Sequence, residues 1–206
     1  MPTSRIVFLD EIFKANSSIL NTLLTIINEK VFHNGVKREK VPLVSLIGAS
    51  NEIPIGNDEL TALYDRFLIR GTVGYVSDEE IELLLETVDS ETVIPEELKF
   101  SVEELGEIRE KSGEVKVSDN IRKAIKDIRT EYNRTFYDEK SEIISDRKLV
   151  KIMKLIRISA YINGRNGVDF SDLLLLSDCL WNDVKNVEKV AKIVLDTVRR
   201  NITRQN

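Results

Sequence analysis

IVFLDEIFK (residues 6–14) begins with four apolar residues and passes directly into two acids, Asp10 and Glu11. Short continuous apolar runs are typical of strands covered on both faces, so residues 6–9 are predicted to form a buried strand of an α/β sheet. In parallel α/β sheets, the groups that bind ligands lie just beyond the carboxyl ends of the strands. The two acids are placed where such a sheet would bind a ligand.

Two adjacent acids at this position are typical of nucleotide hydrolysis. One carboxylate holds Mg²⁺, usually through water, and the other activates the attacking water. The alternative is a helix start, because acids favour the N-terminus of a helix. Taken by themselves, Asp10 and Glu11 fit either interpretation.

Further polar residues follow a second predicted buried strand at residues 43–47. Ser50 and Asn51 come after it, and a polar side chain there would hold the water that attacks a γ-phosphate. Arg66 ends a short predicted helix, and Arg147 lies in the first turn of another, where it opposes the helix dipole. Each arginine taken singly is explained as a solvated surface residue, but the whole set in this order favours phosphoryl transfer.

The first third of the chain reads as α/β. Residues 16–30 have the apolar spacing of an amphipathic helix, with Asn16 or Ser17 near its N-cap. Asn34-Gly35 lies between apolar residues and predicts a hairpin, since a type I′ turn needs φ > 0 at both central positions. A further helix is predicted at residues 59–67, and a third strand at residues 68–76.

The remainder reads as helical. Capping boxes are predicted where a serine is followed three residues later by glutamate, at Ser77 and at Ser101. Pro95, with acidic flanks, is the best boundary, so the predicted domains are an α/β part at residues 1–94 and a helical part at residues 95–206. The fold class is therefore α/β followed by all-α.

Composition limits the possible functions. The 206 residues carry a formal net charge of −5, with a pI of about 5.2, which argues against a nucleic-acid partner or an anionic membrane partner. The single cysteine, Cys179, excludes an internal disulfide and fits a reducing cytosol. No stretch approaches the roughly 20 apolar residues that span a bilayer. We therefore expect a cytoplasmic location.

Several separate motifs, in this order, closely resemble the MoxR group of AAA+ ATPases, in particular the RavA-like branch. They are IVFLDEIFKANSSILNTLLTIINEKVFHNG, IGASNEIP and LYDRFLIR, and the later SDRKLVKIMKLIRISAYINGRNGVDFSDLLLLSDCLW resembles the helical lid of the same branch. The resemblance covers about residues 5–183. It implies an incomplete AAA+ P-loop core, with a Walker B strand, a sensor-1 strand and a hairpin insertion, followed by the helical lid subdomain.

The resemblance also implies site roles. LDEI would be Walker B, with Asp10 on Mg²⁺ through water and Glu11 as catalytic base. Asn51 would be sensor 1. Arg66 would be the finger that acts on a neighbouring subunit's ATP. Arg147 would be sensor 2, in contact with the nucleotide.

Arg70 is a weaker candidate for the finger. The cofactors of the full-length parent would be ATP and Mg²⁺. Its partners would be the other subunits of a hexameric ring and the proteins that the ring remodels in a chaperone-like way.

One element of such a site is not found in these residues. The family binds phosphate through G-x-x-x-x-G-K-[ST], whose backbone N–H groups and lysine cradle the phosphates. None of the nine glycines is followed by lysine, and only nine residues precede Asp10. We therefore expect the C-terminal part of an AAA+ module, lacking Walker A. The isolated chain would then neither bind nor hydrolyse ATP, and we expect no cofactor for it.

The resemblance implies that the P-loop strand lies between the sensor-1 strand and the strand after the finger. Without it the sheet would have unpaired edges, and exposed edges pair with other chains. We therefore expect the isolated chain to form a strand-swapped or edge-paired oligomer. Two other functions stay open: a non-enzymatic interaction module that acts through the lid or by joining a full-length ring, and a DNA-dependent motor, which the acidic pI disfavours.

Overall fold

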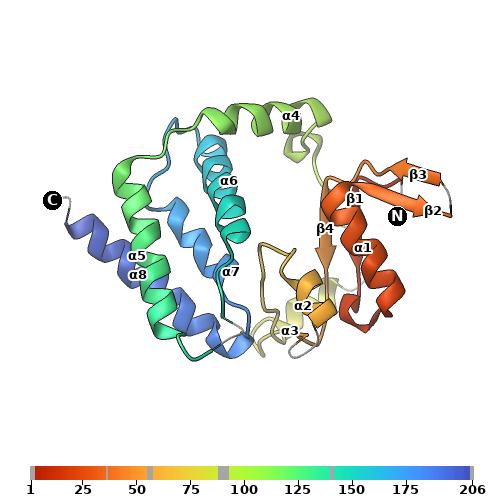
Figure 1. Ribbon diagram of the computed structural model, residues 1–206, viewed down its shortest axis with the longest axis horizontal. Helices are drawn as coiled ribbons and strands as arrows, with labels where there is room; N and C mark the ends of the chain where they lie inside the picture. The colour runs from red at the N-terminus through yellow and green to blue at the C-terminus, as the bar shows by residue number, and fades with distance from the viewer. Residues whose placement is uncertain (1–2, 36, 55–57, 88–92, 140–141, 205–206) are drawn as a thin grey trace. The chain divides into compact units, whose positions relative to one another are not determined.

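The computed structural model describes residues 3–35, 37–54, 58–87, 93–139 and 142–204. The chain divides into two compact units, Met1–Leu68 and Ile69–Asn206 (Figure 1). The first unit is α/β and the second is helical, as the predicted fold class requires. By its contacts, the segment from residue 69 onward belongs to the helical unit, whereas the sequence placed the change of domain near residue 95.

In its described residues, the first unit contains two small sheets, two α-helices and one 3₁₀ helix. Its elements in chain order are β1 (Ile6–Leu9), the 3₁₀ helix η1 (Ile12–Lys14), α1 (Ser17–Glu29), β2 (Val31–Asn34), β3 (Lys37–Lys40), β4 (Ser45–Gly48) and α2 (Asp58–Tyr64). β1 pairs with β4 in parallel, and β2 pairs with β3 antiparallel.

The two predicted buried strands are present as β1 and β4, but the prediction that they are buried on both faces is wrong for this chain. Val7 is buried, while Ile6 and Phe8 are 66% and 62% exposed, and Ile47 on β4 is 51% exposed. Helix α1 covers one face, where Val7 and Ile26 share a cluster of buried apolar side chains. The other face of this two-stranded sheet has no comparable cover among the described residues of the unit, so its apolar side chains stay exposed.

Helix α1 follows the prediction closely. The Asn16 side chain accepts a hydrogen bond from the Ile19 N–H at 3.0 Å and so caps the first turn. The helix ends at Glu29, and Lys30 caps it with φ +55° while its N–H donates to the Ile26 carbonyl at 3.0 Å. Three apolar residues of one face, Leu20, Leu23 and Ile26, are buried.

The predicted hairpin is confirmed, but Asn34 does not lie in its turn as expected. The β2–β3 register pairs Asn34 with Lys37, so Asn34 is the last strand residue rather than a turn centre. Gly35, at φ +60°, supplies the left-handed backbone conformation that such a turn needs.

The third strand, predicted at residues 68–76, is absent. No residue from Leu68 to Ser77 is in a strand, and the side chains of Val73 and Tyr75 are completely exposed. A β-strand is held by hydrogen bonds to a neighbouring strand. The apolar pattern at these residues has no strand partner among the described residues, so the backbone stays irregular.

The regular elements of the second unit are helices, apart from one isolated β-bridge between Lys116 and Gly167, among the residues that the structure describes. Its elements are α3 (Ile81–Thr87), η2 (Glu96–Leu98), α4 (Val102–Lys111), η3 (Ser112–Glu114), α5 (Asp119–Thr135), α6 (Asp146–Ile162), η4 (Asp172–Leu176), α7 (Ser177–Leu180), η5 (Val184–Asn186) and α8 (Val187–Thr203). The capping box at Ser101 is confirmed, because its Oγ accepts from the Glu104 N–H while the Glu104 carboxylate accepts from the Ser101 N–H. At Ser77 no box forms, and α3 begins four residues later.

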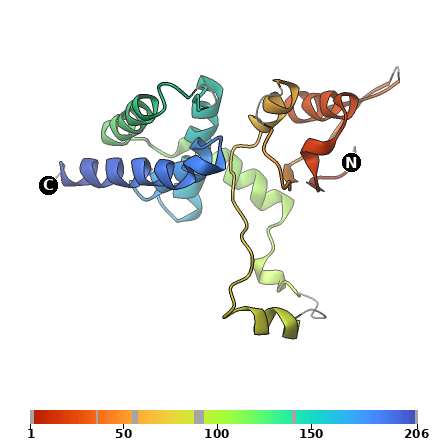
Figure 2. The same cartoon turned by 90° about the horizontal axis from the view of Figure 1, so that it is seen from below.

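Helices α5 and α8 pack side by side in the core of this unit (Figures 1 and 2). Ile121, Ala124 and Ile128 of α5 are buried, as are Val190 and Val194 of α8. None of the helices in the described part of the chain combines the length and apolar character that crossing a bilayer requires.

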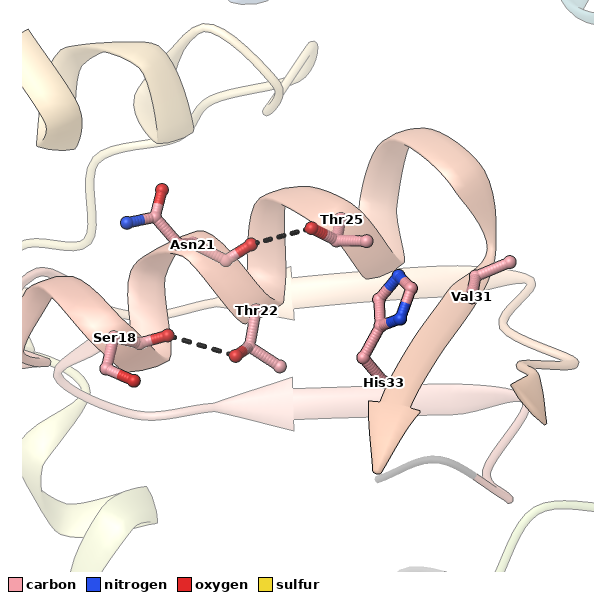
Figure 3. Close-up of a pocket in the computed structure, with 6 residues that line it drawn as sticks. All are labelled: Ser18, Asn21, Thr22, Thr25, Val31 and His33. Carbon is pink, nitrogen blue, oxygen red and sulfur yellow. Dashed lines mark hydrogen bonds between the residues drawn. The ribbon is translucent and has the colours of Figure 1, made fainter. Parts of the chain in front are cut away.

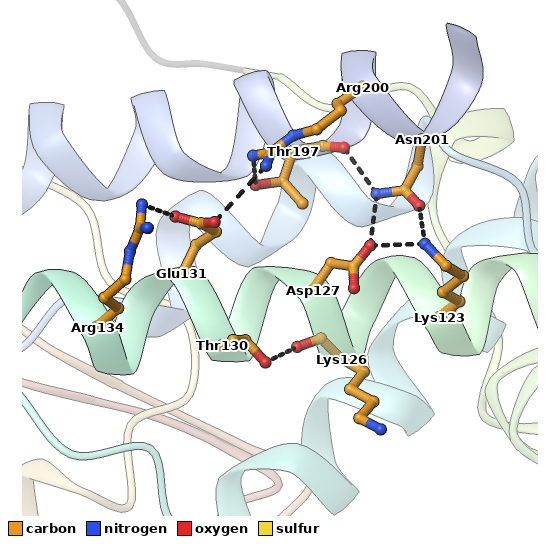
Figure 4. Close-up of polar contacts among 9 residues, drawn as sticks. All are labelled: Lys123, Lys126, Asp127, Thr130, Glu131, Arg134, Thr197, Arg200 and Asn201. Atoms are coloured by element: carbon orange, nitrogen blue, oxygen red, sulfur yellow. Dashed lines mark hydrogen bonds and ion pairs between the residues drawn. The ribbon is translucent and has the colours of Figure 1, made fainter. Parts of the chain in front are cut away.

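A row of polar contacts runs beside this apolar seam (Figure 4). Asn201, 5% exposed, donates from Nδ2 to Asp127 Oδ2 at 3.2 Å and to the Thr197 carbonyl at 3.0 Å. Lys123 Nζ donates to the same Asp127 oxygen at 3.0 Å. Since buried amides need partners, this cluster sets the register of α8 against α5.

Among the described residues of the helical unit, Asp172 is the charged residue with the smallest exposed fraction. Its side chain is 1% exposed, and Arg165 donates to both of its oxygens, at 2.6 Å and 2.8 Å. Ser159 Oγ and the Asp169 N–H donate to it as well. Burial, the largest influence, would raise the pKa of Asp172, but these hydrogen bonds outweigh it and hold the pKa below its ordinary value.

We predict that Asp172→Asn lowers the free energy of unfolding of the helical unit by about 2–3 kcal/mol at neutral pH, because a charge-assisted bidentate pair is lost. The folded pKa lies below the unfolded value of about 3.9, so the contribution is complete above that pH and is lost as pH falls through the folded pKa. The variant should therefore lose less stability than the parent below about pH 4. Urea titrations followed by fluorescence of Trp181, the sole tryptophan, measure both effects.

Asp196→Asn is the control, because Asp196 is exposed on α8. This substitution should leave the pH dependence of the free energy of unfolding unchanged. An Asp172→Asn variant whose stability follows the parent's at every pH would contradict this account of Asp172.

Candidate functional site

The carboxyl ends of β1 and β4 lie next to each other. Leu9 pairs with Gly48, the Ala49 N–H donates to the Leu9 carbonyl at 2.9 Å, and the Ile12 N–H donates to the Ala49 carbonyl at 3.2 Å. The hydrogen-bond ladder therefore continues past both strands into the segments that carry the polar residues. Asp10 and Glu11 on one side, and Ser50 and Asn51 on the other, leave the same edge of the sheet.

Glu11 has an unusual backbone conformation. Its φ of 47° and ψ of 39° are in the left-handed region, which residues with a side chain rarely adopt. Its N–H donates to Asp10 Oδ1 at 2.9 Å. A left-handed conformation costs a residue with a Cβ about 1–2 kcal/mol. Strain of this kind is concentrated at functional sites, where surrounding structure imposes it.

The Glu11 side chain is paired with a lysine that the sequence analysis missed. Lys14 Nζ donates to Glu11 Oε1 at 2.7 Å, and both side chains are about half exposed. The hydrogen bond and the attraction of Glu11 raise the pKa of Lys14, and Glu52 and Asp10 add smaller effects in the same direction. The signal was available, since opposite charges three residues apart in one turn meet.

Asn51 is exposed in the segment that follows β4, as is Ser50. Ser50, the other candidate, is engaged locally. Its Oγ donates to the Glu52 carbonyl at 2.9 Å and accepts from the Glu52 N–H at 3.1 Å. The geometry thus favours Asn51 over Ser50 as the group that contacts a ligand from this strand.

Arg66 follows α2, and the structure ties its segment to the end of β4. The Arg66 N–H donates to the Leu63 carbonyl at 2.9 Å, and its guanidinium lies 3.8 Å from Asp65 with 16% of the side chain exposed. A Cβ added at Gly48 would lie 3.1 Å from the ring of Phe67. Glycine at the strand end therefore permits Phe67, the residue after Arg66, to approach the sheet closely.

The two other candidate arginines, Arg70 and Arg147, belong to the helical unit. Arg147 is exposed in the first turn of α6, two residues after the N-cap Ser145. Arg70 is 6% exposed, and its guanidinium donates to the Trp181 carbonyl and to Asn182 Oδ1. These contacts within its own unit favour a structural role for Arg70 over the finger role.

The described residues contain no ready-made metal centre. No group of three or more His, Cys, Asp or Glu side chains among them is placed to hold an ion. A pocket of about 350 Å³ beside α1 and β2 includes the only histidine (Figure 3). Its lining residues are Ser18, Asn21, Thr22, Thr25, Val31 and His33. The hydroxyls of Thr22 and Thr25 donate to carbonyls of their own helix, so their protons are not available to a ligand.

The edge of the β1–β4 sheet could nevertheless hold Mg²⁺ together with a nucleotide. In nucleotide sites Mg²⁺ keeps several waters and takes one or two carboxylates, with phosphate oxygens completing its shell. Asp10 is an exposed carboxylate at the strand end and suits that role.

Comparison with known proteins agrees with this geometry. Residues 1–109 match the family model of the MoxR domain in the MoxR-vWA-beta-propeller ternary systems, and residues 120–194 match an AAA lid domain. The chain belongs to the MoxR family of AAA+ ATPases.

Relatives of this MoxR chain include two uncharacterised proteins of Methanocaldococcus jannaschii. MJ0079 is 42% identical over 200 residues, which are 97% of this chain and 50% of the relative. MJ0812 is 41% identical over 191 residues, which are 93% of this chain and 49% of the relative. The MoxR chain thus spans about half the length of these curated relatives.

A solved structure shares the fold. The crystal structure of a Cytophaga hutchinsonii protein, described as a candidate ATPase, superposes with a TM-score of 0.66 at 18% identity. The match covers 96% of this MoxR chain and 66% of that one.

We predict that replacing Glu11 with glycine gives a more stable α/β unit than replacing it with alanine, by about 1 kcal/mol. Both variants lose the pairing with Lys14, so their difference isolates the backbone conformation at φ 47°. Hydrogen exchange of the α1 amides, measured on both variants, reports the stability of this unit. Equal protection in the two variants would show that the left-handed conformation at Glu11 is not imposed by the fold.

Proposed function

We propose that this MoxR chain supplies the hydrolytic half of an ATPase site. Asp10 holds Mg²⁺ through water, Glu11 activates the attacking water, and Asn51 orients that water. The observation that carries the proposal is the parallel β1–β4 pairing, which brings the two acids and Asn51 to one strand-end edge. The left-handed conformation of Glu11 supports a functional role for its position.

Arg66 and Arg147 would supply positive charge to the proposed site. During phosphoryl transfer, negative charge spreads over the oxygens of the transferred group, and a guanidinium near them stabilises the transition state. Arg66 would act on the ATP of a neighbouring subunit, and Arg147 would contact nucleotide from the lid. Bound Mg²⁺ neutralises charge on the phosphates, while the protein's part is to orient water, accept its proton at Glu11 and present the arginines.

ATP binding then needs a phosphate cradle from outside these residues. Residues 1–206 contain no Gly-Lys pair, and therefore no P-loop. We infer that the 206-residue chain alone binds ATP very weakly or not at all. Joined to a P-loop-bearing segment, it would work in an oligomeric ring that couples ATP hydrolysis to remodelling of partner proteins.

A second candidate function is a non-enzymatic interaction module. Helix α3 has no buried residue, and Leu83 and Leu85 on it are 62% and 69% exposed. Exposed apolar clusters of this kind mark interaction surfaces. The two functions differ in whether turnover depends on Glu11.

The first experiment is calorimetric titration of residues 1–206 with Mg²⁺ and a non-hydrolysable ATP analogue. We expect no binding heat at micromolar concentrations, because one exposed carboxylate and two separate arginines do not replace a P-loop. Clear micromolar binding would show a phosphate site elsewhere in these residues and would overturn this part of the proposal.

In an assembly that joins these residues to a P-loop, we predict that Glu11→Gln leaves ATP bound but lowers turnover by about 10²–10⁴-fold, the usual effect of losing a general base. Steady-state turnover and nucleotide retention measure the two effects separately. Glu39→Gln, an exposed substitution of the same kind on β3, is the control and should turn over normally. Unchanged turnover in Glu11→Gln would favour the interaction module instead.

A further inference from the structure

Arg70 fixes the point at which the chain enters the helical unit. Its backbone N–H donates to the Asp178 carbonyl at 2.9 Å, and its guanidinium donates to the Trp181 carbonyl and to Asn182 Oδ1, the latter at 2.6 Å. The residues on either side, Ile69 and Gly71, are exposed. In an otherwise irregular and exposed segment, a single buried residue therefore holds the backbone.

Lys148 reaches the same amide oxygen from α6. Its Nζ donates to Asn182 Oδ1 at 2.9 Å, and the residue is 2% exposed. Burying an ammonium group is expensive, and a cation in the first turn of a helix also opposes the helix dipole. An apolar residue would fill this position at lower cost. We therefore infer that the two cations on Asn182 Oδ1 serve to hold the Arg70 segment and the start of α6 in a defined arrangement.

Glu142 anchors the other side of Asn182. It is 3% exposed and accepts from the backbone N–H of Asn182 at 3.0 Å and of Asp183 at 2.9 Å. The Tyr132 hydroxyl donates to Glu142 and to the Leu180 carbonyl. Burial, followed by the hydrogen bond to Glu142, raises the pKa of Tyr132, so the hydroxyl remains a donor. Asn182 is thus held at its backbone while its side chain holds Arg70 and Lys148.

Arg70 and Lys148 lie close in the sequence to the two arginines of the proposed ATPase site. Arg70 comes four residues after Arg66, and Lys148 comes directly after Arg147. We propose that Arg70, Lys148, Asn182 and Glu142 form a positioning clasp. The clasp keeps the segment that follows the finger arginine in fixed register with the helix start that bears the sensor arginine. This proposal rests on the proposed function, because it assigns a task to Arg66 and Arg147.

The coupling within the clasp can be measured on residues 1–206 without nucleotide. We expect Asn182→Leu, which keeps size but removes the shared oxygen, to speed exchange of the Arg70 amide by about tenfold or more, together with the Leu149 amide in the first turn of α6. Lys148→Met puts an unbranched apolar side chain in the buried position, so the variant should stay folded. It should also speed exchange of the Arg70 amide.

Asn201→Leu is the matched control. Asn201 is an amide in the same unit that also accepts from a lysine, Lys123, on the α5–α8 seam; it is 5% exposed, whereas Asn182 is half-buried (Figure 4). It should destabilise the unit without selectively releasing Arg70. If Asn182→Leu and Lys148→Met leave Arg70 exchange no faster than Asn201→Leu does, the clasp is not coupled and the inference is wrong.

The effect on catalysis is tested in an assembly that contains a P-loop. A positioning role predicts that Asn182→Leu lowers kcat by about tenfold while KM for ATP changes less than about twofold. In an Arg66→Lys background the same change should add less than about twofold, because residues that act as a unit are not additive. A merely structural role would give additive losses, and Asn201→Leu would then match Asn182→Leu.

The outcomes separate the two proposals. If Glu11→Gln retains turnover, the proposed ATPase function fails, whereas the exchange coupling between Lys148 and Arg70 is still measured directly. If Glu11→Gln abolishes turnover but Asn182→Leu behaves as Asn201→Leu does, the ATPase function stands and the clasp is refuted.

Discussion

Parallel pairing of β1 with β4 is the interaction on which the candidate site depends. Glu11 and Asn51 are far apart in the chain, and they share one sheet edge because Leu9 pairs with Gly48 and the ladder continues through Ala49. A two-stranded sheet is only marginally stable by itself. The packing of Val7 against α1, with Val41 and Leu43, therefore contributes much of what holds the edge in place.

Small local features then determine where the side chains at this edge lie. Glycine at position 48 lets the ring of Phe67 approach the strand end, which holds the segment of Arg66 against the sheet. The left-handed backbone at Glu11 turns the chain sharply from β1 into η1, so the acid pair is presented at the edge rather than buried under it. Both features place candidate site residues at some cost in local freedom, which is common at sites that bind ligands.

The helical unit is organised differently, around buried and half-buried polar groups. Asp172 is held by Arg165, Asn201 by Asp127, and Asn182 by the clasp residues. Such groups add little net stability compared with apolar residues of the same size, but they are costly to misplace. Their value is that they specify one arrangement of the helices, including the start of α6, where Arg147 is exposed.

Several features of this MoxR chain were determined by the sequence alone, because they depend on neighbouring residues. Asn16 and Ser101 cap helices where local hydrogen bonding predicted them, and Gly35 marks the hairpin. The acids at the end of β1 and the polar residues after β4 were likewise identified from their place after apolar runs. Motif order in the sequence was also enough to name the family.

Tertiary structure alone decided the rest, because it depends on partners that are distant in the chain. Residues 68–76 have a strand's composition but no strand to pair with, and Ile6 and Phe8 are exposed on a sheet covered on one face. The Ser50 hydroxyl is hydrogen-bonded to the backbone of Glu52, whereas Asn51 is exposed. No local pattern shows that Arg70 and Lys148 converge on Asn182, since only the packing of α6 against the segment after α7 brings them together.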